Sequence, residues 1–409
     1  MARSAEICSR WNIKKIGGFA LSDRIETNQA PMTGPSQKPL LGLNHNELDA
    51  LLDEFHEPSY RAQQVFEALY RQRVESLEQI STLPASLRRE LSERGYGIGA
   101  PAIESKFQSL DGTVRYLIAC TDGQTAETVW MPEGDGGEAG DGSEAGEETS
   151  RRWDRATVCV SSQIGCAVDC QFCLTAQLGM KRNLSAGEIV GQVCALLRDQ
   201  NVSPPRDRIN LVFMGMGEPF LNYDNCMKAV RLLVEGVGIP ESRMTLSTAG
   251  IVPRIHDFGA EPVRPKLAIS LNASNDEMRT QLMPINKKWN LALLLEVART
   301  FPLRPRERLT FEYVLLADIN DSPEHARQVV ELVRGLRAKV NLIALNPGPG
   351  IAFGTPQSDR VLAFQKVLVS AGVPAFIRRP RGRDIYAACG QLKRTLEVSA
   401  AESRMVQLG

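Results

Sequence analysis

Residues 161–173 of this 409-residue chain read SSQIGCAVDCQFC, which places Cys166, Cys170 and Cys173 in a C-x3-C-x2-C pattern. A β-rich run from Ala156 to Ser161 comes directly before them, so we expect the three thiols on a loop at the end of a strand. Cysteine thiolates bind iron–sulfur clusters, and three of them on one short loop can hold three irons of a 4Fe–4S cluster. The fourth iron then stays open to a small chelating ligand. The pattern therefore predicts an open 4Fe–4S site.

Zinc binding is the alternative that the cysteines leave open. Cys159 would add the fourth sulfur that a closed structural zinc site needs. The chain would then be a zinc-stabilised RNA-binding protein without catalysis. The position of Cys159 inside a predicted strand, with six residues between it and Cys166, makes a tetrahedral site awkward and favours the cluster.

Downstream of the cysteines, short β-rich runs alternate with helical patterns. This alternation predicts an α/β fold in which about six parallel strands form a partial or complete barrel. Functional residues in such sheets gather at the carboxyl ends of the strands. The predicted strands are 156–161, 208–214, 243–247, 266–271, 309–316 and 340–345, and the predicted helices lie around 186–199, 223–235, 291–300, 323–337 and 358–371.

Upstream of the barrel the sequence pattern changes. Apolar residues at helical spacing predict a small helical accessory domain, and two β-rich runs around Asp122-Gly123 predict a hairpin-like connector. The stretch from Gly134 to Ser150 is acidic, rich in glycine and without large apolar residues, which predicts a disordered loop. The predicted boundaries are 1–40 for a disordered extension, 41–100 for the helical domain, 101–133 for the connector, 134–152 for the acidic loop, 153–395 for the barrel with a catalytic C-terminal segment, and 396–409 for a tail.

The formal net charge is zero, with 48 lysines and arginines against 48 aspartates and glutamates. A balanced charge argues against a protein that coats nucleic acid by bulk electrostatics. Seven of the carboxylates lie at Glu133 and in the acidic loop, however, and the rest of the chain has 48 bases against 41 acids. Local basic clusters could then contact phosphates, above all Arg378 to Arg383 and the arginines at 304, 306 and 308.

Nine cysteines without an export signal indicate thiol or metal chemistry in a reducing compartment. No apolar run approaches the roughly 20 residues that cross a bilayer. We therefore expect a soluble cytoplasmic protein with no membrane partner.

The cysteine pattern, with Phe172 before its last cysteine, resembles the radical S-adenosylmethionine (SAM) enzymes, whose open iron chelates SAM. Further motifs resemble the RlmN/Cfr family of RNA adenosine methyltransferases, over roughly Leu41 to Arg394. The resemblance implies a partial (β/α)6 radical SAM barrel, a small N-terminal helical domain, a β connector, a 4Fe–4S cluster and two SAM molecules per turnover. The motifs are RATVCVSSQ at 155–163, GMKRNL at 179–184, MGMGEP at 214–219, LSTAG at 246–250 and AACGQL at 387–392.

The resemblance also implies the residues of the site. Cys166, Cys170 and Cys173 would bind the cluster. Asn272 stands where many relatives have histidine. The residues implied at the SAM site, most of them at predicted strand ends, are Gly217, Glu218, Ser247, Ser270, Leu271, Asn272 and Asn346.

The implied reaction has two stages, because an adenine ring carbon is too electron-poor to attack SAM directly. Cys389 takes a methyl group from one SAM, and a 5′-deoxyadenosyl radical from a second SAM abstracts hydrogen from that methyl. The carbon radical adds to the adenine, and Glu127 accepts the former ring proton. Cys159 then forms a disulfide with Cys389 as the methylated RNA leaves, and a cellular thiol reduces it.

The implied substrate is an adenosine of 23S ribosomal RNA, methylated at C2, with some tRNAs as further substrates. Methylation at C8, as in the Cfr branch, is the alternative that Lys181 in GMKRNL leaves open. The target base would have to turn out of its surroundings to reach the barrel interior. We also expect a reducing electron donor, a thiol reductant and a monomeric enzyme.

Overall fold

The computed structural model describes residues 37–132, 138–139 and 155–392. The predicted C-terminal tail lies outside these residues. So does the predicted disordered extension, except for its last residues, 37–40. There the boundary at residue 40 is too late, because strand β1 (Lys38–Pro39) pairs with β2 (Tyr96–Gly97) and Leu40 is buried. Most of the acidic loop also lies outside the described residues. Two of its residues, Glu138–Ala139, form the short strand β6. The prediction that the whole loop is disordered is therefore wrong at these two residues.

The helical region after β1 begins at a capping box. Asn44 accepts a hydrogen bond from the Glu47 amide at 2.9 Å, and the Glu47 carboxylate accepts one from the Asn44 amide at 2.7 Å. These contacts satisfy amides that a helix start otherwise leaves unpaired. The helices of this region are α1 (His45–Asp53), α2 (Tyr60–Glu67), which continues as a π-helical turn at Ala68–Gln72, and α3 (Ala85–Glu93).

The connector consists of three antiparallel strands, β3 (Ala102–Gln108), β4 (Val114–Ala119) and β5 (Thr125–Pro132). It is not a separate hairpin, because β5 pairs antiparallel with the first barrel strand, β7 (Ala156–Cys159). The connector therefore extends the barrel sheet and brings β5 beside the strand that leads into the cysteine loop.

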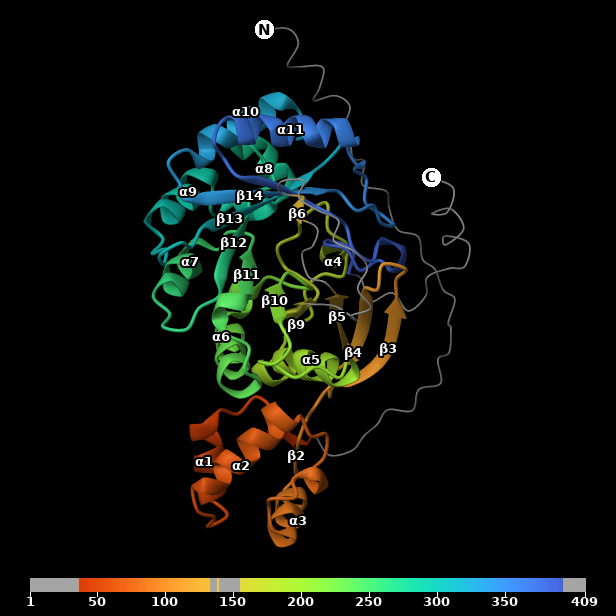
Figure 1. Ribbon diagram of the computed structural model, residues 1–409, viewed down its shortest axis with the longest axis vertical. Helices are drawn as coiled ribbons and strands as arrows, with labels where there is room; N and C mark the ends of the chain where they lie inside the picture. Colours follow the sequence, from red (N-terminus) through yellow and green to blue (C-terminus); the bar gives the residue numbers. More distant parts are fainter. Residues whose placement is uncertain (1–36, 133–137, 140–154, 393–409) are drawn as a thin grey trace. The chain divides into compact units, whose positions relative to one another are not determined.

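The barrel sheet runs in the order β7-β10-β11-β12-β13-β14-β15, with every neighbouring pair parallel. Figure 1 labels its middle strands, β10 to β14. The α/β fold is thus confirmed, with one parallel strand more than predicted. The extra strand, β15, has only four residues and runs into the basic cluster, which hides its β pattern. The strands after β7 are β10 (Ile209–Phe213), β11 (Met244–Thr248), β12 (Lys266–Ser270), β13 (Leu309–Leu315), β14 (Ala338–Ala344) and β15 (Ala375–Arg378).

Helices connect these strands, and none of those described is long and apolar enough to cross a membrane. A capping box starts the helix α5 (Ala186–Asp199), since the Ser185 hydroxyl accepts a hydrogen bond from the Glu188 amide at 3.1 Å. A small sheet of β8 (Gln163–Ile164) and β9 (Arg182–Asn183) brackets the cysteine loop. The helices are α4 (Leu174–Gln177), α5 (Ala186–Asp199), α6 (Tyr223–Leu232), α7 (Val252–Gly259), α8 (Asp276–Leu282), α9 (Leu291–Thr300), α10 (Pro323–Val333) and α11 (Ser358–Ser370).

Candidate active site

The cysteine loop leaves the carboxyl end of β7 and turns at Gly165. Its φ is +79°, and a Cβ there would lie 1.7 Å from the Gly179 carbonyl oxygen, so only glycine fits. Cys166, Cys170 and Cys173 line one cavity, which we call the cluster cavity. Burial raises the pKa of Cys166 and of Cys173, while neighbouring backbone amides lower it, those of Val168 at Cys166 and of Ala176 at Cys173. Amide donors aimed at the sulfurs favour the thiolates that metals bind.

The spacing of these sulfurs fits a cluster better than zinc. The sulfurs of the three loop cysteines do not all lie within 4.8 Å of one another. Among the described residues, the one group of three potential ligands that does is Cys120, Asp122 and Glu188. Sulfurs around a tetrahedral zinc, at 2.3 Å from the metal, lie only about 3.8 Å apart. A cubane takes each thiolate on a different iron and spreads them more widely. The carboxylates of the compact group are already paired with Arg182.

Residues of five parallel strands, β10 to β14, complete the cluster cavity. Of the seven residues predicted to bind SAM, six lie in its wall. The seventh, Leu271, is fully buried outside the wall, with its amide donating to the Glu312 carbonyl and its carbonyl accepting from Arg279. The six are Gly217, Glu218, Ser247, Ser270, Asn272 and Asn346.

Glu218 is the carboxylate of this wall. Its two oxygens accept from the amides of Ala249 at 2.6 Å and Phe220 at 3.0 Å, which fixes the side chain. Burial raises its pKa to about 7. Gly217, at φ +98°, lets the chain pass so close to Gln163 that a Cβ would lie 2.5 Å from the Gln163 Cβ.

The two asparagines of the wall differ in what they can offer a ligand. The Asn272 oxygen already accepts from the Val314 amide at 2.8 Å. The Asn346 Oδ1 atom is buried and has no hydrogen-bond partner among the described residues. An acceptor without a partner, in the same wall as a carboxylate, suits the amino group of SAM, so these residues fit the cofactor.

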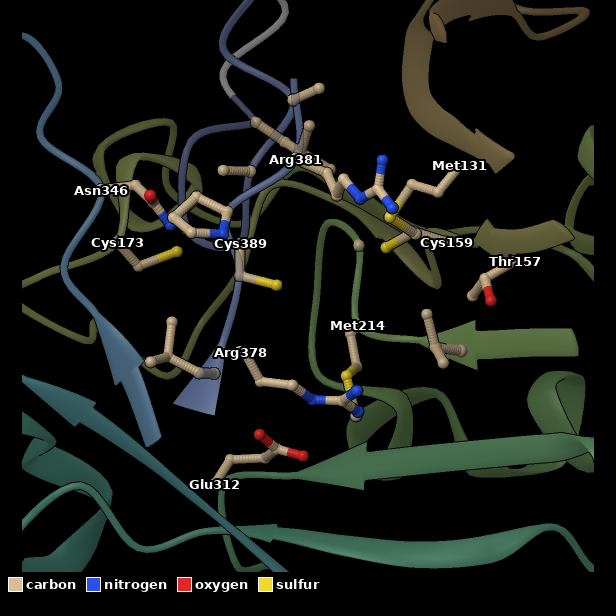
Figure 2. Close-up of a pocket in the computed structure, with 18 of the residues that line it drawn as sticks. Met131, Thr157, Cys159, Cys173, Met214, Glu312, Asn346, Arg378, Arg381 and Cys389 are labelled. Atoms are coloured by element: carbon tan, nitrogen blue, oxygen red, sulfur yellow. The ribbon is translucent and has the colours of Figure 1, made fainter. Parts of the chain in front are cut away.

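A second cavity, the cysteine cavity, adjoins the first and contains Cys159 and Cys389 in its wall (Figure 2). Cys389 and Cys173 belong to the walls of both cavities, whereas Cys159 belongs only to the second. Cys389 is solvent-accessible through the cavity, yet the surrounding protein and then Glu312 raise the pKa of its thiol. Cys389 therefore lies between the two cavities and lines both.

The C-terminal segment that carries Cys389 is docked at both ends. Beyond the cysteine, the Leu174 amide donates to the Gly390 carbonyl at 2.7 Å, and the Thr175 hydroxyl donates to the Leu392 carbonyl at 2.8 Å. Before it, Ser109 in the β3–β4 turn donates to the Asp384 carboxylate at 2.5 Å. These bonds hold the thiol next to the cluster loop.

Comparisons with known proteins agree with this geometry. The model of the radical SAM superfamily matches residues 160–331, and that of the ribosomal RNA large subunit methyltransferase N-terminal domain matches 38–96. The "Probable dual-specificity RNA methyltransferase RlmN" of Koribacter versatilis is 65% identical over 84% of this chain and 98% of its own length. The chain belongs to the RlmN family. The "Dual-specificity RNA methyltransferase RlmN" of Syntrophobacter fumaroxidans is 45% identical over 85% of this chain and 95% of its own.

A solved structure extends the comparison to the fold. A radical SAM methyltransferase from Sphaerobacter thermophilus superposes with a TM-score of 0.78 at 40% identity, over 87% of this chain and 99% of the other. As a member of the RlmN family, the chain is a SAM-dependent RNA methyltransferase that uses a 4Fe–4S cluster. Family membership removes the zinc-stabilised, non-catalytic alternative.

Glu127, predicted from the sequence as the proton acceptor, lies apart from the residues gathered above. Its carboxylate pairs with the guanidinium of Arg115 at 2.5 Å, and both side chains are about 1% exposed. Arg115 in turn lies over the ring of Phe107. Glu127 is on β5, next to the strand of Cys159, but not in the wall of either cavity as the described residues form them.

Two residues that shape the site escape prediction from the sequence. Glu312 on β13 lines both cavities, and a single charge inside the otherwise apolar run LTFEYVL is the signal that could have revealed it. Arg279 on α8 is fully buried and donates to the carbonyls of Ala249, Ser270 and Leu271. It ties together the ends of β11 and β12, and no sequence pattern distinguishes it from a surface arginine.

Proposed function

We propose that this enzyme methylates C2 of adenosines in 23S ribosomal RNA and in tRNA, through a methyl group carried on Cys389. The observation that carries the proposal is the place of Cys389 in both the cluster cavity and the cysteine cavity, between the SAM residues and Cys159. The dual specificity in the names of the relatives supports both RNA classes.

In this proposal Cys166, Cys170 and Cys173 hold the cluster, and the six wall residues together with Leu271 hold SAM. When bound, these groups supply a methyl group and a 5′-deoxyadenosyl radical. Glu218 and Asn346 accept hydrogen bonds from SAM and orient it toward Cys389.

Cys389 and Cys159, the two cysteines of the cysteine cavity that do not hold the cluster, would act in turn. Cys389 holds the methyl group as a thioether that faces both SAM and RNA. Cys159 releases the product by forming a disulfide with Cys389, and a thiol reductant restores both thiols. The shared cavity supports this pairing, because both thiols face the same hollow and a disulfide needs them to approach until their Cβ atoms lie about 4 Å apart.

Glu127 is proposed as the acceptor of the adenine ring proton on the strength of the family position alone. Its pairing with Arg115 keeps the carboxylate in a fixed place beside β7. A small movement of β5 side chains toward the cysteine cavity would be needed for contact with the base.

The cellular setting completes the proposal. We place the enzyme in the cytoplasm, as a monomer that draws on an electron donor and a thiol reductant. The helical region at 41–100 would be an RNA-binding accessory domain, and the segment 153–395 the catalytic unit.

Mass spectrometry of nucleosides tests the proposed reaction. The anaerobically reconstituted enzyme is incubated with SAM, a reductant and either 23S ribosomal RNA or tRNA that lacks the modification. The proposal predicts 2-methyladenosine in both RNAs. Formation of 8-methyladenosine would support the Cfr-like alternative instead, and absence of any methyladenosine would contradict both.

A further inference from the structure

A third cavity, the floor cavity, lies at the amino ends of the parallel strands, opposite the cluster. It has a volume of about 650 Å³, and eight of its twenty lining residues are basic. They come from chain segments that precede β7, β11 and β13, and from β12, β14 and β15. The eight are Arg155, Arg243, Lys266, Arg304, Arg306, Arg308, Lys339 and Arg378.

The positive charge of this cavity is largely uncompensated. Among the described residues its wall contains two acidic residues, Glu307 and Glu312, and the Glu307 carboxylate is already bound by the buried Arg264 at 2.9 and 3.0 Å. Five of the bases have no carboxylate within 4.0 Å among the described residues. These are Arg243, Lys266, Arg304, Arg306 and Arg308. Such a concentration of one charge sign in a hollow attracts a polyanion.

Two buried polar atoms in the same wall lack partners. The Thr157 hydroxyl and the Asn341 Oδ1 atom are each about 98% or more buried, and neither makes a hydrogen bond within the described residues. The Asn341 amide nitrogen donates to Glu312 at 2.8 Å, which leaves its oxygen as an acceptor toward the cavity. Buried polar atoms without partners are rare in native proteins, so a polar ligand is expected here.

The floor cavity adjoins the cysteine cavity. The two walls share five residues, namely Thr157, Val212, Met214, Glu312 and Arg378. SAM and the cluster would take up the carboxyl ends of the strands, on the far side of Cys389. The adenine must therefore meet Cys389 from another side, and the floor cavity supplies a basic approach to it.

We propose that the RNA strand enters the barrel at the amino ends of its strands and that the floor cavity binds the phosphates that flank the target adenosine. The inference rests on the proposed function. Arg243, Lys266 and Arg308 contact phosphate oxygens, and Thr157 and Asn341 meet polar groups of the nucleotide. A cavity of this volume takes an unpaired nucleotide rather than a helix, so the target base is turned out before it enters.

The charge-removing double variant Lys266→Ala/Arg308→Ala tests this inference. Binding of an unmodified tRNA to the reconstituted enzyme is measured as a function of salt concentration. We expect affinity at low salt to fall on the order of tenfold. The slope of log affinity against log salt should decrease by about two, one for each phosphate that the variant no longer neutralises. The conservative variant Lys266→Arg/Arg308→Lys should restore both.

A matched control removes the same charge elsewhere. Arg299→Ala/Lys366→Ala takes two exposed bases from α9 and α11 and should bind RNA like the unchanged enzyme. Iron content and methylation of Cys389 by SAM without RNA show whether each protein is folded and loaded. Unchanged RNA affinity and salt slope in the loaded Lys266→Ala/Arg308→Ala variant overturn the inference. Absence of Cys389 methylation in the unchanged enzyme would instead contradict the proposed function.

Discussion

The Cys389 thiol lies close enough to Cys159 to raise the pKa of the Cys159 thiol, in addition to the larger effect of burial. The two residues come from opposite ends of the barrel sequence, yet both line the cysteine cavity. Both are free cysteines. The proposed release of product by disulfide formation requires this proximity.

The two cysteines should therefore have different variant phenotypes. Cys389→Ala has no acceptor for the methyl group and should abolish RNA methylation. Cys159→Ala can still join the RNA to Cys389 but cannot release it, so a covalent protein–RNA adduct should accumulate. Denaturing gels with labelled RNA distinguish the two outcomes.

The control for this experiment is Cys226→Ala, which alters a buried cysteine in α6 far along the chain from both. It should methylate RNA without adduct. Turnover by Cys389→Ala, or adduct-free turnover by Cys159→Ala, contradicts the two-cysteine scheme.

Glu218 predicts a pH dependence of SAM binding. Since burial raises its pKa to about 7, the carboxyl is protonated at pH 6 and ionised at pH 8. The ionised form is the stronger acceptor, so SAM affinity should increase as the pH rises through 7. The same raised pKa means that ionisation costs more in the fold than in the unfolded chain. This group therefore destabilises the unliganded protein progressively as the pH rises from about 4.5 through 7.

Equilibrium dialysis with labelled SAM at pH 6 and pH 8 measures the binding effect. Glu218→Gln keeps the shape of the side chain but cannot titrate. Any change of SAM affinity with pH that the unchanged enzyme shows and this variant lacks is therefore due to Glu218. Identical pH responses in the two proteins would exclude the carboxylate from the SAM site.

Arg279 should matter for stability although it touches no substrate. Its guanidinium donates to three strand-end carbonyls and to the side chain of Asn286. Arg279→Met leaves these buried acceptors without donors, at about 1–3 kcal/mol each before relaxation, so we expect a loss on the order of 3 kcal/mol. Anaerobic urea unfolding measures it against Arg299→Met, an exposed arginine. Equal unfolding midpoints would show that the network contributes nothing.

Asp384 should control how often Cys389 meets Cys159. Asp384→Ala removes the bond from Ser109 and a weaker one from the Leu110 amide, which together hold the segment before Cys389. Hydrogen bonds to a charged group stabilise by about 1.5–3 kcal/mol, so disulfide formation under a mild oxidant should slow on the order of tenfold. Non-reducing peptide mapping follows the reaction. Asp53→Ala, at the exposed end of α1, serves as control, and equal rates in the two variants would rule out this role.

Local patterns made the cluster loop and most of the barrel predictable from sequence. Cys166, Cys170 and Cys173 lie within a stretch of eight residues, and the periodicity of strands and helices can be read from short stretches of sequence. The floor cavity is different, because its bases are scattered from Arg155 to Arg378 and meet only where parallel strands align their amino ends. The ion pair of Arg115 and Glu127 likewise depends on the pairing of β4 with β5. Such long-range contacts leave no local trace in the sequence.

The route of the methyl group through Cys389 is tested most directly with SAM that carries a CD3 methyl group. Mass spectrometry of the RNA nucleosides then counts the deuterium atoms in the product. Since hydrogen abstraction removes one deuterium from the methyl group on Cys389, we predict 2-methyladenosine with two deuterium atoms. A product that retains all three would mean direct transfer from SAM and would contradict the account.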